Sequence, residues 1–175
     1  MKHMKYLFTC LLLALATTSL VAQKQTFDAA TYTAPQGWKK ASQTTSAVSY
    51  ATTNNEKGTY CQIGIYASTT SKGSLQADFK SEWEELIVKL YKPTEAATLV
   101  PTTSDNGWDI QGGSAPFEFS GSRSVAMLVT ASGHGRCMSI VILTNTVDHQ
   151  TVIQDFIESV SLNKPETMTT VVSSP

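Results

Sequence analysis

The sequence SVAMLVTASGHGRCMSIVILT, residues 124–144, decides the fold. It contains two near-continuous apolar runs, residues 124–130 and 136–144, on either side of a Gly-His-Gly turn at residues 133–135. Strands with so little polar alternation are usually covered on both faces or lie at the centre of a sheet. The stretch therefore predicts two neighbouring central strands joined by a tight turn.

Four further strands are predicted upstream of this stretch. The clearest is residues 59–67, where Cys61, Ile63 and Ile65 recur with a period of two. The polar segment 52–58 before it is typical of a hairpin loop. The other predicted strands are residues 31–34, 47–51 and 108–119.

Two amphipathic helices are predicted where the apolar spacing changes to three and four residues. The first covers residues 75–90, with Ser74 as its N-cap and Pro93 as its stop. The second has apolar residues at helical spacing over residues 152–160, with Asp148 as its expected cap. Each helix must bury its apolar stripe against the sheet.

The order of these elements predicts an α+β fold. We expect a mainly antiparallel six-stranded sheet with two packed amphipathic helices, in the order of three strands, a helix, three strands and a helix. This single domain would cover residues 23–162. Residues 163–175 have no apolar period and are rich in Thr and Ser, so a flexible C-terminal tail is predicted there.

The first 22 residues have the pattern of a secretory signal peptide. Lys2 and Lys5 precede an uncharged apolar run at residues 6–16, and cleavage is expected after Ala22. An uncleaved anchor, or a lipoprotein modified at Cys10, is the alternative. The pattern predicts export to the periplasm or the extracellular space, with no integral membrane span after cleavage.

Charge and composition exclude two broad classes of function. The chain of 175 residues has a formal charge of −1, and cleavage after Ala22 would leave the rest at −3. A nucleic-acid binder would need clustered basic residues, and an acidic disordered chain would need far more negative charge. The chain instead has 24 Thr and 19 Ser, which is typical of a sheet-rich surface.

Two short motifs resemble the PsbP-like superfamily of α/β/α sandwich domains. They are YTAPQGW at residues 32–38 and FIESV at residues 156–160. The order of elements over residues 27–162 is also similar, and the chain looks most like the uncharacterised bacterial secreted members. The resemblance implies a binding or assembly-stabilising role rather than catalysis.

Two cysteines would remain after cleavage, Cys61 and Cys137. An even number of cysteines in an exported chain suggests a disulfide between them. The alternative is two buried free thiols that pack as small apolar groups.

The residues predict no metal site, cofactor or catalytic residue. His134 and His149 are the only histidines after residue 22, and no Cys-x-x-Cys or His-x-x-x-His spacing is present. No serine lies in a Gly-x-Ser-x-Gly motif, and Gly112-Gly113 lacks the Lys of a phosphate-binding loop.

Four aromatic residues are candidates for a binding surface: Trp38, Trp108, Tyr60 and Tyr66. Exposed aromatic rings bind sugars or partner proteins well. The alternative is that these rings pack beneath a helix or a loop.

Three functions remain open on these grounds. The first is an exported, non-enzymatic domain that binds or stabilises a partner in the cell envelope. The second is a carbohydrate-binding module that uses exposed aromatics. The third is a small hydrolase with an unidentified site. The expected partner is therefore an envelope protein or a glycan, and not a nucleic acid.

Overall fold

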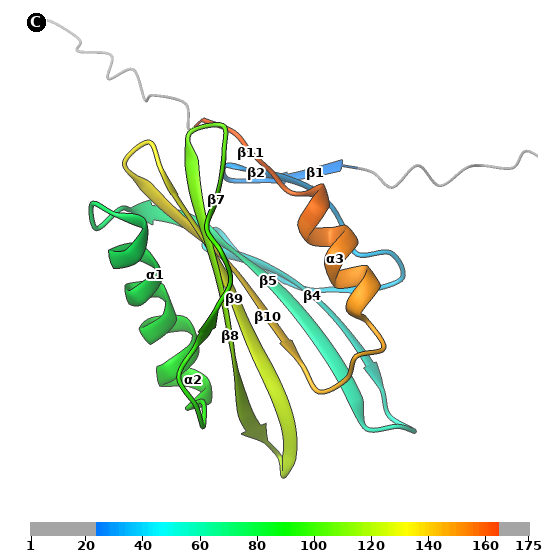
Figure 1. The fold of residues 1–175 in the computed structure, drawn as a ribbon. Helices are drawn as coiled ribbons and strands as arrows, with labels where there is room; N and C mark the ends of the chain where they lie inside the picture. Colours follow the sequence, from blue (N-terminus) through cyan, green and yellow to red (C-terminus); the bar gives the residue numbers. More distant parts are fainter. Residues whose placement is uncertain (1–23, 165–175) are drawn as a thin grey trace, which may run out of the picture.

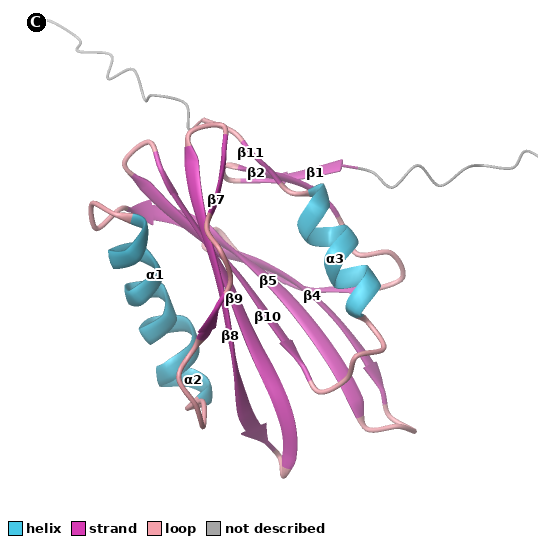
Figure 2. Cartoon of the chain, in the orientation of Figure 1, coloured by secondary structure: helices cyan, strands magenta, loops and turns pink. Residues whose placement is uncertain are grey.

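The computed structural model of the protein describes residues 24–164. The predicted signal peptide lies outside the described residues, as does the predicted tail beyond Lys164. Strands account for 52% of the described residues and helices for 19%, so the fold is dominated by its sheets. Figures 1 and 2 show one large sheet between two helical layers.

The large sheet has eight strands, and every pairing in it is antiparallel. Its two central strands are those predicted from residues 124–144, because β10 lies between β5 and β9 and is joined to β9 by the predicted tight turn. In spatial order the strands are β3 (Lys39–Gln43), β4 (Ala47–Asn54), β5 (Thr59–Thr70), β10 (Arg136–Thr144), β9 (Ser122–Gly133), β8 (Trp108–Phe119) and β6 (Thr98–Leu99), with β7 (Thr103–Asp105) also paired to β8.

One face of this sheet is covered by α3 (Gln150–Ser159) and by a small antiparallel sheet. The small sheet contains β1 (Lys24–Phe27), β2 (Ala30–Thr33) and β11 (Ser161–Leu162). Tyr32 joins these parts, since its ring lies edge-on to Phe156 of α3 at 5.8 Å and its hydroxyl is 3.1 Å from that of Tyr50.

The opposite face is covered by one long helical segment. It begins with α1 (Leu75–Trp83), continues through a π-helical turn (Glu84–Val88) and ends with α2 (Lys89–Tyr91). Ser74 caps it as predicted, because its hydroxyl accepts a hydrogen bond from the Ala77 amide at 3.2 Å. Phe79 and Ile87 pack from this segment onto Phe117, Leu128 and Val141 of the sheet.

A buried carboxylate fixes α1 to the sheet. Asp78 is 1% exposed, and the hydroxyls of Ser71 and Ser132 each donate to it at 2.6 Å. The Lys72 amide donates to its second oxygen. These bonds satisfy a charged group that would otherwise be costly to bury.

The predicted fold class is wrong in the number of strands and in their order. The large sheet has eight strands rather than six, and five strands rather than three precede the first helix. β3, β6 and β7 are exposed at every position, so they carry no apolar period that the sequence could reveal. The predicted strand at residues 31–34 pairs in the small sheet, as part of β2. The cap of α3 is His149 and not Asp148.

The layers differ in length, and this difference positions the candidate site. α3 has 10 residues and β9 has 12, which correspond to about 15 Å of helix and about 40 Å of strand. One short helix cannot cover such strands. In Figure 1 the β8–β9 and β4–β5 hairpins extend beyond the helices on both faces.

Candidate functional site

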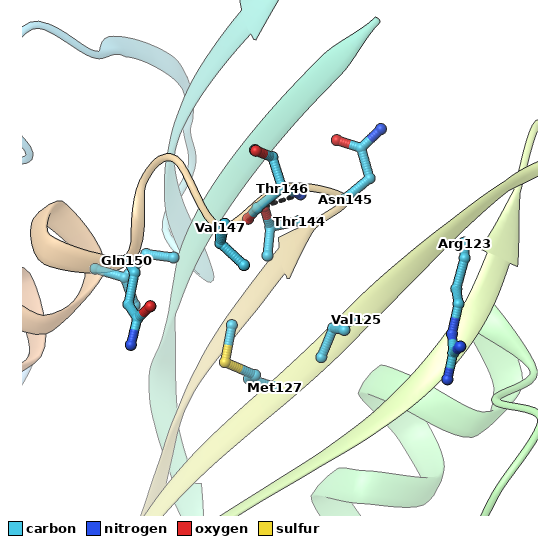
Figure 3. Close-up of a pocket in the computed structure, with 9 residues that line it drawn as sticks. Arg123, Val125, Met127, Thr144, Asn145, Thr146, Val147 and Gln150 are labelled. Carbon is cyan, nitrogen blue, oxygen red and sulfur yellow. Dashed lines mark hydrogen bonds between the residues drawn. The ribbon is translucent and has the colours of Figure 1, made fainter.

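A groove of about 680 Å³ lies beside α3 on the uncovered part of the sheet. We call it the α3-side groove. It is lined by Arg123, Val125, Met127, Thr144, Asn145, Thr146, Val147, Gln150 and Ile153. In Figure 3 the apolar side chains lie between Arg123 at one end and Gln150 at the other.

The floor of this groove follows from strand alternation in β9. Ala126 and Leu128 point towards α1 and are fully buried. Their neighbours Val125 and Met127 therefore point to the α3 side, where the strand extends beyond its cover. Val125 remains 37% exposed.

The far wall is the loop between β10 and α3, which carries Val147 at 80% exposure. Polar bonds hold this loop in place. The Asn145 side chain accepts from the Tyr60 amide at 2.8 Å and donates to the Gly58 carbonyl at 2.9 Å. The Thr144 hydroxyl accepts from the Thr146 amide at 3.2 Å. Because the loop is already ordered, the exposed Val147 side chain can contact a partner with little loss of conformational entropy on binding.

Charges lie only at the rim of the groove. Arg123 is exposed, and its register partner on β8 is Glu118. Asp148, next to Val147, is 3.8 Å from Lys57 in an exposed ion pair. Such pairs contribute little to stability. An apolar centre with a polar rim is the usual organisation of a protein interface.

The four candidate aromatic residues do not form one exposed surface, and the prediction is wrong for Trp108. Trp108 is fully buried, and Trp38 packs at the edge of the same core, below α3. Tyr60 and Tyr66 do point to the other face of the sheet, but both pack against the core beneath α1. This packing matches the alternative in which these two rings lie beneath a helix.

The candidate disulfide is not formed, because the fold separates the two cysteines. Cys61 pairs with Thr144 at one end of the β5–β10 ladder, and Cys137 pairs with Thr69 at the other end. Both are buried free thiols. Burial raises the pKa of Cys61 to about 11. Burial, together with the nearby carboxylates of Glu82 and Asp78, raises the pKa of Cys137 to about 12.

The two histidines each pack against a tryptophan. His134 lies edge-on to Trp108 at 5.5 Å, and its Nε2 is 3.0 Å from the Asn106 carbonyl oxygen. His149 lies edge-on to Trp38 at 5.4 Å. Within residues 24–164 no three His, Cys, Asp or Glu side chains are grouped closely enough to hold a metal ion.

No pattern in the sequence singled out the α3-side groove. The apolar pattern of residues 124–130 predicts a strand that is covered on both faces or central in the sheet, and the candidate binding residues are all aromatic. The available signal was length, because the predicted helix of residues 152–160 would be about 14 Å long and the predicted strand of residues 124–130 about 23 Å. Arg123 and the polar residues after position 143 also mark where the cover ends.

Comparisons with known proteins support the fold alone. No protein family and no curated protein matches the chain. A crystal structure of a protein from Bacteroides thetaiotaomicron is similar over 82% of this chain, with a TM-score of 0.55 and 10% identity. The match covers 49% of that protein, so this chain spans about half of its length. Human StAR-related lipid transfer protein 5 aligns over 71% of this chain and 84% of its own, with a TM-score of 0.29 and 8% identity.

These comparisons do not test the resemblance to the PsbP-like superfamily, which stays a prediction. None of the helices among the described residues is both long enough and apolar enough to cross a membrane.

Proposed function

We propose that this chain is an exported, non-catalytic domain that binds a protein partner in the cell envelope through the α3-side groove. The observation that carries the proposal is the apolar strip formed by Val125, Met127 and Val147 beside α3. Apolar residues gathered in an exposed groove with a polar rim are typical of an interaction site.

The exposure of the groove favours a protein over a small ligand. A small-molecule pocket buries most of its ligand. Here the Val147 side chain is mostly exposed and Val125 is partly exposed. A small molecule in the groove would therefore remain largely in contact with water. A partner that lies along the groove covers both valines at once.

The layer beside the groove indicates the shape of the partner. α3 already packs on this face of the sheet through Ile153, Phe156 and Ile157. A second amphipathic helix fits the same layer, parallel or antiparallel to α3, with its apolar stripe on Val125 and Met127. The bound segment is therefore an amphipathic helix of the partner.

Export is supported by the signal-like pattern of residues 1–22. The two buried thiols are compatible with an oxidising compartment. Their raised pKa values keep them protonated, and a protonated thiol is a poor nucleophile.

A photoreactive residue at position 125 tests the proposal in the cells that make the protein. The control places the same residue at position 90, because Leu90 is an equally apolar side chain, 59% exposed, on α2. We expect one defined protein adduct from position 125 and not from position 90. Recovery of the monomer alone from position 125, or the same adducts from both positions, contradicts the proposal.

A further inference from the structure

A second groove lies on the opposite face of the large sheet, beyond the end of α2. It has a volume of about 600 Å³ and is bounded by α2, the β4–β5 hairpin and the end of β8. We call it the α2-side groove. It lies on the α1 face of the sheet, so it is separate from the α3-side groove.

Four aromatic residues line this groove: Tyr60, Tyr91, Phe119 and the buried Phe117. Phe119 is 55% exposed, although it is a large apolar ring. The Tyr60 ring packs edge-on against Phe119, with 5.9 Å between the ring centroids. The Tyr60 hydroxyl donates a hydrogen bond to the Ser124 hydroxyl at 2.9 Å. One edge of the Phe119 ring is therefore held by Tyr60, and the rest of the ring is exposed to solvent.

Neutral polar side chains line much of the rest of the groove. Gln62 points from β5 to this face and is exposed, with Ala51 and Leu143 as its neighbours on the adjacent strands. Asn55 adds a second exposed amide from the β4–β5 loop. Among the described residues that line this groove there is no Asp, Glu, Lys or Arg.

This combination favours one chemical class of ligand. A charged ligand would find no counter-charge in the groove, and a purely apolar ligand would leave the amides without partners. A sugar ring has an apolar face of C–H groups and a rim of hydroxyls. The C–H face can pack on Phe119 and Tyr91, and amides both donate to and accept from hydroxyls.

We propose that the α2-side groove binds a neutral carbohydrate. Phe119 provides the stacking surface, Tyr60 holds it in place, and Gln62 and Asn55 bind sugar hydroxyls. This site does not depend on the partner proposed for the α3-side groove, and either one can be present without the other.

The test measures binding of purified protein to a panel of neutral hexasaccharides built from glucose, mannose, xylose or N-acetylglucosamine. A charged galacturonate hexasaccharide is included for comparison. Binding is followed by titration calorimetry and by the NMR signals of the side-chain amides. We expect at least one neutral oligosaccharide to bind and to shift the Gln62 amide signals, and the charged one not to bind.

Substitutions in the two grooves then test where the oligosaccharide binds. Phe119→Ala and Gln62→Ala should each weaken binding about tenfold, and Phe119→Trp should retain it. Val147→Ala in the α3-side groove is the control and should bind as the parent does. The proposal is overturned if no neutral member of the panel binds, or if Phe119→Ala and Gln62→Ala bind as tightly as the parent protein.

Discussion

Val125 of β9 and Val147 of the loop before α3 line the same groove from two different elements, and both remain exposed. Exposed single valines are ordinary, but two that converge on one groove form a patch. Asn145 hydrogen-bonds the loop that carries Val147 to Tyr60 of β5 and to Gly58. The two valines therefore keep the same relative position when no partner is bound. This relation is the basis for treating the groove as a binding surface.

The stability of the isolated domain should not depend on Val125. In the Val125→Glu variant the new carboxylate reaches water, so the free energy of unfolding should change by less than about 0.5 kcal/mol. Urea denaturation followed by circular dichroism measures this change. The matched control is Leu128→Glu on the buried side of the same strand, which should not give a folded protein. A large loss of stability for Val125→Glu would mean that Val125 belongs to the core.

Asp78 should be a major anchor of α1. Asp78→Ala leaves two hydroxyls and one amide without their charged acceptor, so we expect a loss of about 2–4 kcal/mol in the free energy of unfolding. Asp109→Ala is the control, because that carboxylate accepts from Ser104 at the exposed surface and should cost less than about 1 kcal/mol. Equal losses for the two variants would show that the buried cluster has no special role.

Gly113 should be required for the close approach of α1 to the sheet. A Cβ atom there would lie 2.7 Å from Cζ of the buried Phe79 ring. We therefore expect Gly113→Ala to cost about 1–3 kcal/mol in thermal or urea unfolding. Gly112→Ala is the control, since its nearest contact is the exposed side chain of Val100, which can move.

A double variant checks the cause of this loss. Phe79→Leu shortens the side chain that the added methyl would meet. Gly113→Ala should therefore cost less in the Phe79→Leu background than in the parent. An equal cost in both backgrounds would trace the loss to the strand and not to helix packing.

The two thiols should react slowly in the folded protein. With pKa values of about 11 for Cys61 and about 12 for Cys137, few thiolates are present at pH 8. In the chain comprising residues 23–175, alkylation followed by mass spectrometry should label neither cysteine quickly, and should label both after unfolding without a reductant. An unfolded chain that is not labelled would mean that the disulfide forms after all.

The same shifts predict how stability depends on pH. A thiol whose folded pKa is raised binds its proton more tightly in the folded state than in the unfolded state. Its contribution is therefore complete below pH 9 and is lost as the pH rises towards 12. Cys137→Ala should lose less stability between pH 9 and 11 than the parent. A steeper decline in the variant would contradict the assignment.

Local patterns predicted the centre of the fold, but not its edges. The apolar run around Val141 and the stripe that contains Phe79 each report burial directly, so both elements were found. β3 and β7 are held by backbone hydrogen bonds to a neighbour and carry exposed side chains. Side-chain patterns cannot reveal strands of this kind.

The sites were harder to predict because they depend on what covers each face. Trp108 and Val125 are both apolar strand residues, yet one is fully buried and the other is partly exposed. The difference comes from the short α3 and from β11, whose pairing with β2 closes the small sheet. Such long-range pairing leaves no local signature in the sequence.

The affinity of the purified domain for the protein captured at position 125 tests the central claim most directly. Isothermal titration should give a dissociation constant for the parent protein that rises at least about tenfold in Val125→Glu. Leu90→Glu, which changes an exposed residue away from the groove, should bind as the parent does. If Val125→Glu binds as tightly as the parent, the α3-side groove is not the binding surface.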